Sequence, residues 1–355
     1  MGALHLTQTA LSLLRHKGIS ISEDEYEATL IAILLHDVGH GPFSHALESV
    51  LVPHLRHEQM SLLIMQELNR VFNRDLELAI RIFEGQYGRP FFHELISSQL
   101  DMDRMDYLMR DSFYTGVQEG IVGTDRIIKT LNVHNDKLVV EEKGLYSVEK
   151  FIVARRLMYW QVYLHKTALV AENMLVQVLE MAREELKEGV DLSCDVNLIW
   201  LLRDADEKTE PRQLVKWFTA IDDTEIMYGL KQWRYAKHPI LSDFCNRLID
   251  RRLLKIRFYK QMVPAEEVLR VRNYYQEALN LPEEASASYV FGKQVSNRAY
   301  EARNAESIQI LYKDGSTRDL ADASDLANIG ALRREVVKYY LCYPGSNHFP
   351  FPENA

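Results

Sequence analysis

The sequence predicts a mainly α-helical protein with a short β-hairpin and a small C-terminal region of mixed α and β structure. Only 16 Gly and 10 Pro occur in 355 residues, which favours long helices because both residue types interrupt regular structure. Apolar residues recur at helical spacing along most of the chain. With 47% hydrophobic and 26% charged residues, the composition is that of a folded globular protein and excludes an intrinsically disordered chain.

The first predicted element is an amphipathic helix over residues 1–18, whose interrupted apolar pattern differs from that of a signal peptide. Its start, Met1-Gly2-Ala3, offers no capping side chain. Two interpretations follow: the first turn is frayed, or the helix continued upstream and has been cut. A second helix begins at the capping box Ser22-Glu23-Asp24-Glu25 and ends before Gly41-Pro42. Its predicted apolar face consists of Tyr26, Leu30, Ile33 and Leu34.

Helical periodicity continues from about residue 58 to 72 and from about residue 92 to 112. Residues 133–140 predict a β-hairpin, because short apolar strands flank an Asn-Asp pair that suits its turn.

A long helix is predicted from about residue 148 to 187, closed by Gly189, and several helices follow over residues 196–280. Within that region, residues 251–260 hold five basic side chains among aromatic and aliphatic ones. We predict a helix with one solvated basic face there, because the aliphatic residues suit a core. Binding of nucleic acid or of an effector nucleotide is the alternative interpretation of this segment.

The composition changes after Pro282. Residues 288–291 and 307–312 are predicted strands, and Asp314-Gly315 is a turn motif. A last helix is predicted near residues 325–340, followed by a tail over residues 344–355 that we expect to be mobile.

The formal charge, 42 basic minus 51 acidic residues, is −9, and a field of that sign disfavours binding along a nucleic-acid backbone. The three Cys residues are far apart in the sequence, which excludes a CxxC metal site and fits a reducing cytoplasm. No apolar run approaches the roughly 18–20 residues that cross a bilayer. We therefore expect a cytoplasmic protein without a membrane or nucleic-acid partner.

Histidines are concentrated in one part of the chain. Five of the twelve lie between residues 36 and 57, namely His36, His40, His45, His54 and His57. The aliphatic segment LIAILL places His36 beside Asp37 at its end, where an unpaired charge would be costly and a divalent cation would remove that cost. His40 follows one helical turn later on the same side. The Gly41-Pro42 break then folds His45 and Glu48 back over the site.

A second group of carboxylates lies in LDMDRMDYLMRD, residues 100–111. On a helix, Asp103, Tyr107 and Arg110 share one face, and Asp111 lies close to it. The remaining surface is apolar and consists of Met102, Met105, Leu108 and Met109. We predict that this helix is buried, so that its carboxylates need partners. A solvated, salt-bridged helix is the alternative.

Three strings of the sequence together resemble a known family: HDVGHGPFSH at residues 36–45, HE at residues 57–58 and DMDRMDYLMRD at residues 101–111. They are similar to the motifs of HD-domain metal-dependent phosphohydrolases, in particular the deoxynucleoside triphosphate triphosphohydrolase, or dGTPase-like, branch. The resemblance covers roughly residues 1–170 and implies an HD-domain helical bundle there. We expect a helical extension packed on this core over residues 171–281, and a small α+β region over residues 282–343.

The resemblance also implies roles for individual side chains. His36, Asp37 and Asp103 would bind a divalent metal ion, with Fe, Mn, Zn, Ni and Mg all candidates. His45 would transfer a proton, supported by Glu48 and His57, with His40 beside the scissile phosphate. The positions that would line the substrate are Arg104, Tyr107, Arg155, Tyr163 and Lys166. Tyr159 stands where some relatives carry His.

The first metal ligand of this family is a His in a segment of the type R-F-x-H-S-(L/M)-G, whose end corresponds to Met1-Gly2. That His would lie two residues before Met1. His5 does not replace it, because six residues along a helix is nearly the opposite face. We therefore expect that the chain is truncated and carries three of the four ligands.

The implied activity is metal-dependent hydrolysis of a deoxynucleoside triphosphate to the deoxynucleoside and triphosphate, by a homo-oligomer that is at least a dimer. Two alternatives stay open. One is an HD phosphohydrolase that acts on another nucleotide phosphoester, and the other is a nucleotide-binding regulatory module without catalysis. Release of triphosphate separates the two enzymes, while metal content and turnover separate both from the regulatory module.

Overall fold

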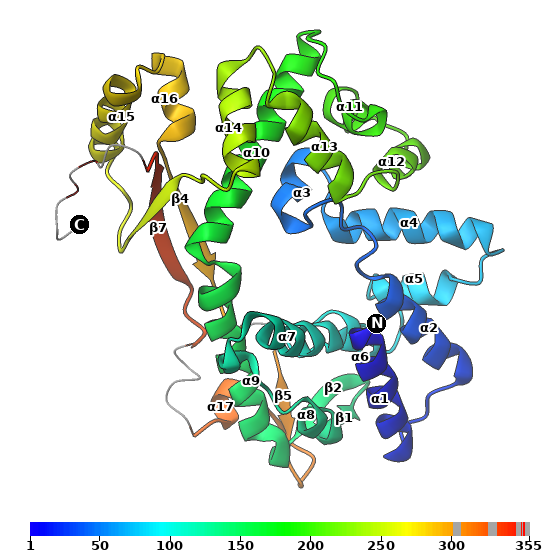
Figure 1. The fold of residues 1–355 in the computed structure, drawn as a ribbon. Coiled ribbons are helices and arrows are strands. Elements are labelled where there is room, and N and C mark those ends of the chain that lie inside the picture. The colour runs from blue at the N-terminus through cyan, green and yellow to red at the C-terminus, as the bar shows by residue number, and fades with distance from the viewer. Residues whose placement is uncertain (301–306, 326–331, 346–348, 350, 352–355) are drawn as a thin grey trace. The chain divides into compact units, whose positions relative to one another are not determined.

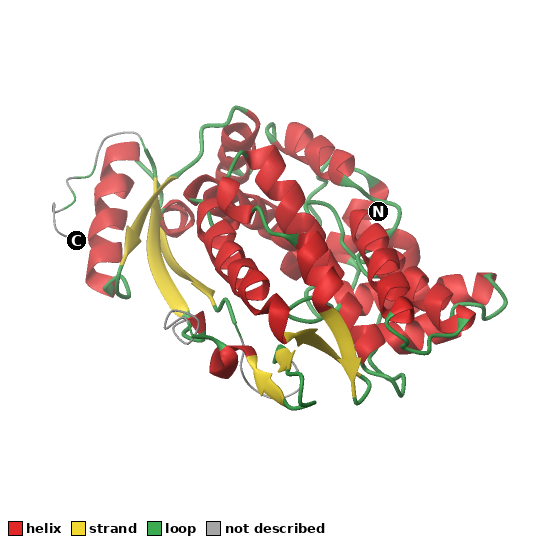
Figure 2. Cartoon of the chain, turned by 90° about the horizontal axis from the view of Figure 1, so that it is seen from below, coloured by secondary structure: helices red, strands yellow, loops and turns green. Residues whose placement is uncertain are grey.

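The computed structural model describes residues 1–300, 307–325, 332–345, 349 and 351. Helices make up most of this part of the chain, and its strands form two small sheets (Figure 1, Figure 2). The predicted mainly α-helical fold, with a short β-hairpin and a C-terminal region of mixed structure, is confirmed.

The chain folds into two compact units that alternate along the sequence. Unit 1 comprises residues 1–38, 64–163 and 297–336, and unit 2 comprises residues 39–63, 164–296 and 337–355. The helix α4 (His57–Val71) begins in unit 2 and ends in unit 1. The boundaries expected near residues 170, 281 and 343 stay predictions.

Unit 1 combines helices with one sheet. Its helices are α1 (Gly2–His16), α2 (Glu23–Leu35), α5 (Glu77–Phe83), α6 (Phe91–Ile96), α7 (Met102–Thr115), α8 (Thr124–Thr130), α9 (Leu145–Met158) and α17 (Leu320–Ala323). Its strands are β1 (Leu131–His134), β2 (Lys137–Glu141), β5 (Gln309–Leu311) and β6 (Thr317–Asp319), in the order β1-β2-β5-β6. The β2–β5 pair is parallel, and the other two pairs are antiparallel.

The capping box predicted for α2 is present. The Ser22 side chain accepts a hydrogen bond from the Glu25 amide, and the Glu25 carboxylate accepts one from the Ser22 amide at 2.8 Å. These bonds satisfy two amides of the first turn and fix where the helix begins. The predicted apolar face is wrong at Leu34, which is 48% exposed. The core side of α2 instead contains Ala28, Ala32 and Ile33.

The β-hairpin predicted over residues 133–140 is present as β1 and β2. Asn135 and Asp136 have φ values of 52° and 56°, the left-handed conformation that a two-residue turn matching the strand twist requires. The register pairs His134 with Lys137 and Leu131 with Val140.

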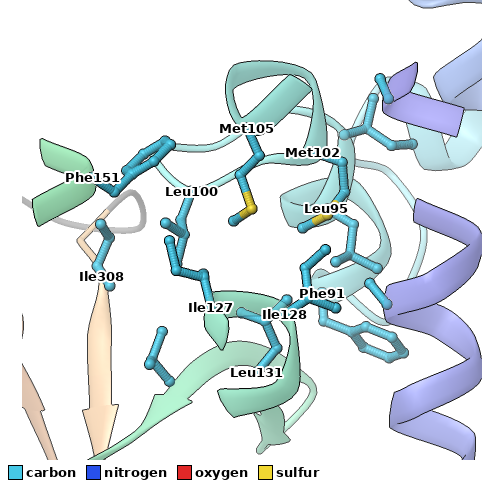
Figure 3. Packing of buried hydrophobic residues seen from close by; sticks show 14 of the residues in the cluster. Phe91, Leu95, Leu100, Met102, Met105, Ile127, Ile128, Leu131, Phe151 and Ile308 are labelled. Carbon is cyan, nitrogen blue, oxygen red and sulfur yellow. The ribbon is translucent and has the colours of Figure 1, made fainter. Parts of the chain in front are cut away.

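The core of unit 1 holds α7 in place (Figure 3). Met102 and Met105 of α7 are fully buried among Phe91 and Leu95 of α6 and Ile127 of α8. Burial of each such side chain contributes about 1.5–3 kcal/mol. The prediction that this helix is buried is confirmed for these methionines and for Leu108, which is also fully buried. It is wrong for Met109, which is 37% exposed.

Two stretches predicted as single helices are each interrupted. Residues 92–112 divide into α6 and α7 because Asp101 caps a new helix, its carboxylate accepting from the Arg104 amide at 2.7 Å. Residues 148–187 divide into α9, a π-helical turn at Tyr159–Tyr163 and α10 (Lys166–Lys187). The His165 side chain caps α10 in the same way.

Unit 2 is built mainly from helices that follow α10. They are α11 (Val196–Arg203), α12 (Pro211–Phe218), α13 (Asp223–Trp233), α14 (Pro239–Ile249), α15 (Ala265–Leu279) and α16 (Glu283–Tyr289), together with the earlier α3 (His45–Leu51). Two of these helices begin at a proline, since Pro211 and Pro239 are the first residues of α12 and α14. A three-stranded sheet has the order β3 (Lys255–Tyr259), β7 (Val336–Tyr343), β4 (Phe291–Asn297).

Three predictions in the C-terminal half are wrong. The basic segment 251–260 contains strand β3 rather than a helix, because it pairs antiparallel with β7 and long-range pairing overrides local helical preference. The predicted helix near 325–340 is strand β7 from Val336 onward, while residues 326–331 lie outside the described part. Residues 288–289 end helix α16, so the strand there begins only at Phe291.

The remaining C-terminal predictions have mixed outcomes. A strand lies within residues 307–312, and Gly315 adopts a φ of +83° in the predicted turn. Most of the tail predicted to be mobile lies outside the described residues. Of its described part, Phe349 packs its ring 5.2 Å from that of Tyr274.

Among the described residues, no helix combines the length and the apolar character that crossing a bilayer requires.

The close packing of Gly144 gives a test of the unit 1 core. A methyl group at this position would collide with Thr130 Oγ1 and lie 2.7 Å from Val140 Cγ1, although the φ of −90° allows any residue. We expect Gly144→Ala to lower the free energy of unfolding by about 1–3 kcal/mol through overpacking, measured by chemical denaturation.

Gly88→Ala is the matched control, because its methyl group would meet nothing within 4 Å. It should change the free energy of unfolding by less than about 0.5 kcal/mol. Equal effects of the two variants would contradict the packing described here.

Candidate metal centre and active-site groups

Unit 1 brings together the three side chains predicted to bind metal. His36 and Asp37 follow the last residue of α2, and Asp103 lies in the first turn of α7. His36 Nε2 lies 3.2 Å from Asp37 Oδ2 and 3.6 Å from Asp103 Oδ1. One ligand atom from each side chain lies within 4.8 Å of the others, so a single cation can contact all three.

The orientation of His36 suits a metal ligand. Its Nδ1 donates a hydrogen bond to the Ile33 carbonyl at 2.7 Å, which leaves Nε2 turned toward the two carboxylates. A backbone carbonyl on the second ring nitrogen is the usual arrangement that fixes the tautomer of a metal-bound histidine. The ring therefore needs no rearrangement before it can bind a cation.

The two carboxylates of this site also favour a positive charge between them. Burial lowers the pKa of His36, but its hydrogen bonds to Asp103 and Asp37 outweigh burial and raise the pKa to about 10. The two carboxylates thus hold a cationic partner between them. A donor set of one imidazole and two carboxylates fits a divalent ion such as Mn, Fe, Zn, Ni or Mg.

A cationic group follows the metal ligands along α7. Arg104 Nε donates to the Ser98 carbonyl at 2.7 Å and to Asp101 Oδ2 at 3.0 Å. Burial lowers the pKa of Arg104, but the charge of Asp101 outweighs it and the pKa is raised. Asp101 is 3% exposed and both caps α7 and orients this guanidinium. Asp101 was not among the predicted site residues, although its place before the helix suggests a cap.

Arg155 of α9 carries an unusual buried charge. Its Nε and Nη1 are buried and have no hydrogen-bond partner in the described part of the chain. Burial and the nearby charge of Arg104 lower its pKa. Buried guanidinium groups normally pair with an anion, because leaving one unpaired costs free energy. An anionic group bound beside Arg155 and Arg104 would satisfy both.

Aromatic rings adjoin these arginines. The Tyr163 ring meets those of Tyr107 and Tyr159 edge to face, with centroids 5.9 and 5.3 Å away. Tyr163 donates a hydrogen bond to Asp111 Oδ2 at 2.7 Å. Burial raises the pKa of both Tyr107 and Tyr163, so both phenols stay protonated. Tyr163 and Asp111 are 52 residues apart, a distance over which sequence spacing gives no signal.

Unit 2 gathers the predicted proton-transfer residues into a second group. The ring of His40 stacks on that of His57, with centroids 4.1 Å apart, and meets His45 edge to face at 4.6 Å. His45 Nδ1 lies 3.2 Å from Glu48 Oε2, and His57 Nδ1 lies 3.2 Å from the same atom. One carboxylate therefore orients two imidazoles.

Glu48 remains an anion in this position. Burial raises its pKa, but the hydrogen bond from the His57 amide and those from His45 and His57 outweigh burial, and the pKa is lowered. His45 is the most accessible of these side chains, at 72% exposed. Glu58, which was given no role from the sequence, lies 3.4 Å from His57 Nε2.

A close backbone approach fixes the His40–His57 stack. Gly39 is buried, and its amide donates to Ser61 Oγ at 2.9 Å. A methyl group at this position would collide with the His57 carbonyl and the Ser61 amide. Only glycine lets residue 40 approach the start of α4 so closely.

The turn before α3 is strained. Phe43 and Ser44 have φ values of 55° and 48°, a conformation that non-glycine residues adopt at a cost of about 1–3 kcal/mol each. His45 is the first residue after this turn. The strained backbone therefore sets the direction from which His45 emerges.

Lys166 belongs to unit 2 and begins α10. It lines a hollow there with Arg251, Arg252 and Lys255. The structure thus gathers the other four predicted substrate-lining residues in unit 1 and places Lys166 in this basic hollow.

The comparisons with known proteins agree with the motifs of this site. Residues 4–111 match the family described as HD domain, and residues 122–216 match the HD associated region. The chain is 33% identical over 343 residues to the uncharacterised protein YwfO of Bacillus subtilis, covering 91% of this chain and 74% of that protein.

A further relative is the deoxynucleoside triphosphate triphosphohydrolase SAMHD1 homolog of Dictyostelium discoideum, 28% identical over 48% of this chain and 36% of that protein. A solved structure of a phosphohydrolase from Bacteroides thetaiotaomicron is 42% identical, with a TM-score of 0.90, over 96% of this chain and 85% of that one. This chain therefore belongs to the HD-domain phosphohydrolase family.

Proposed function

We propose that this chain hydrolyses deoxynucleoside triphosphates to the deoxynucleoside and triphosphate with the help of a divalent metal ion. The observation that carries the proposal is the succession of two groups along α7. Asp103 completes a cation-binding set, and Arg104, the next residue, begins a group that includes the unpaired guanidinium of Arg155. A metal phosphate complex supplies a cation that the first group can hold and an anion that can pair with Arg155. The similarity to the Dictyostelium protein supports the choice of substrate.

His36, Asp37 and Asp103 would hold the ion. When bound, it would polarise a phosphoryl oxygen and lower the pKa of a coordinated water molecule. The bond from Nδ1 to the Ile33 carbonyl keeps the His36 ring turned toward it.

Arg104 and Arg155 would bind phosphate oxygens. A guanidinium presents several donors in one plane and matches phosphate geometry, and Arg155 has two donors to spare. Tyr107 and Tyr163 would pack against the sugar, with Tyr159 beside them. Lys166 is proposed to contact the substrate as well.

His45 would act as the general acid. In hydrolysis at the α-phosphorus, the water oxygen forms a bond to phosphorus, the bond from phosphorus to the 5′ oxygen breaks, and that oxygen takes up a proton. Glu48 holds Nδ1 of His45, which leaves Nε2 to donate that proton. His40 and His57 would support the transfer.

The homo-oligomeric state, at least a dimer, and the cytoplasmic location expected from the sequence stay proposals.

Removal of a metal ligand gives the first test. We expect His36→Ala and Asp37→Ala to lower the bound metal by more than about tenfold, since loss of even an outer partner of a ligand costs 10- to 100-fold in affinity. Metal content is measured by mass spectrometry of the purified protein, and circular dichroism checks the fold. His16→Ala, at the exposed end of α1, should keep the metal. Normal metal content in both ligand variants would contradict the assignment.

Arg155→Met separates binding from folding. Because the variant removes an unpaired buried cation, we expect the free energy of unfolding to stay the same or rise by about 1 kcal/mol. The stabilisation that inorganic triphosphate gives the wild type should largely disappear. Thermal unfolding with and without triphosphate measures both effects, and the exposed Arg126→Met is the control. A full response to triphosphate in Arg155→Met would rule out this anion site.

Turnover tests the proton transfer and the substrate together. The wild type should release triphosphate and deoxynucleoside, separated by ion chromatography. His45→Ala should keep its metal and lose on the order of 10²-fold in kcat, whereas His54→Ala, in the same segment, should keep its activity. Release of monophosphate or pyrophosphate would exclude this substrate chemistry, and full turnover by His45→Ala would exclude His45 as the acid.

A further inference from the structure

The strained turn before His45 is held from a distant part of the chain. The Phe43 amide donates a hydrogen bond to Asp223 Oδ1 at 2.8 Å, across 180 residues of sequence. Phe43 is one of the two residues with positive φ in this turn. A hydrogen bond to a carboxylate is stronger than one to a neutral acceptor, so this bond stabilises a backbone conformation that is otherwise unfavourable.

A second contact reaches the same turn from the same place. Phe218, the last residue of α12, packs on Gly41, where a methyl group would lie 2.9 Å from Phe218 Cζ. Asp223 is the first residue of α13. The corner between α12 and α13, residues 218–223, therefore contacts the turn of residues 41–44 twice. Its first residue, Phe218, packs on Gly41, and its last residue, Asp223, binds the Phe43 amide.

The corner has a fixed shape of its own. The Asp222 side chain accepts from the Thr224 amide at 2.6 Å, and the Asp222 amide donates to Glu225 Oε2 at 2.6 Å. This capping box sets the direction in which α13 begins. The carboxylate of Asp223 is thus presented by a rigid element rather than by a loose loop.

We propose that Asp223 is a positioning residue for the general acid: it holds the strained Phe43–Ser44 turn so that His45 reaches the leaving oxygen. The inference rests on the proposed role of His45. Asp223 does not touch the substrate. It acts through the backbone, and without its bond the turn relaxes and His45 leaves its contact with Glu48.

Kinetics of three variants test the proposal. Asp223→Ala should lower kcat on the order of 10- to 10²-fold, the cost of a small misplacement of a catalytic group, with little change in KM. Asp223→Asn keeps an oxygen acceptor and should recover most of the loss. Asp195→Ala removes the cap of α11, a different helix of the same unit, so it should lower the thermal stability and leave kcat near wild type.

A double-variant comparison distinguishes positioning from a general structural effect. In the His45→Ala background, Asp223→Ala should cause no further loss of kcat, because the group that it positions is absent. An equal fold-loss in both backgrounds, or the same loss in Asp195→Ala, would overturn the proposal.

A measurement without turnover keeps this test independent of the proposed function. In Asp223→Ala, hydrogen exchange of the Phe43 amide should accelerate on the order of tenfold or more, and the NMR signals of the His45 ring should shift. If the wild type hydrolyses no nucleotide, this measurement alone decides. Unchanged exchange at Phe43 and unchanged His45 signals would overturn the positioning role.

Discussion

The structure of unit 1 depends on one constraint: two carboxylates, those of Asp37 and Asp103, lie beside the oriented imidazole of His36. Asp37 follows the end of α2, Asp103 lies in the first turn of α7, and both lie within 3.6 Å of His36 Nε2. This arrangement persists only with a positive charge between them. The fully buried Met102 and Met105 hold α7 against the core, which fixes the position of Asp103. The hydrogen bond from His36 Nδ1 to the Ile33 carbonyl fixes the orientation of the His36 ring. One face of α7 thus packs in the apolar core, and another face carries the polar site.

Two groups of opposite charge begin at neighbouring residues of α7. Asp103 joins His36 and Asp37 in a set that can hold a cation. Arg104 lies near Arg155, whose buried Nε and Nη1 have no hydrogen-bond partner among the described residues. A buried charge without a partner costs free energy, and a ligand that brings a metal ion and phosphates together would suit both groups. Strain at Phe43 and Ser44 is a second cost, located where a histidine is presented.

Local chemistry determined which parts of the fold were predictable. The Ser22–Glu25 box, the Asn-Asp turn and the apolar face of α7 each depend on neighbouring residues, and each was predicted. Strands β3 and β7 were predicted as helices because their pairing joins residues 80 or more positions apart. The site followed the same rule: the His36-Asp37 pair was visible in the sequence, whereas the contacts of Asp111 with Tyr163 and of Asp223 with Phe43 depend on tertiary structure.

Gly39 constrains how this protein can vary during evolution. Its buried backbone touches Ser61 and the His57 carbonyl, so any larger residue displaces the first turn of α4 and carries His57 away from His40. A relative that replaces this glycine must therefore reshape α4 at the same time. Positions 39 and 61 are expected to change together or not at all, and a descendant that has lost the stacked pair should show substitutions at both.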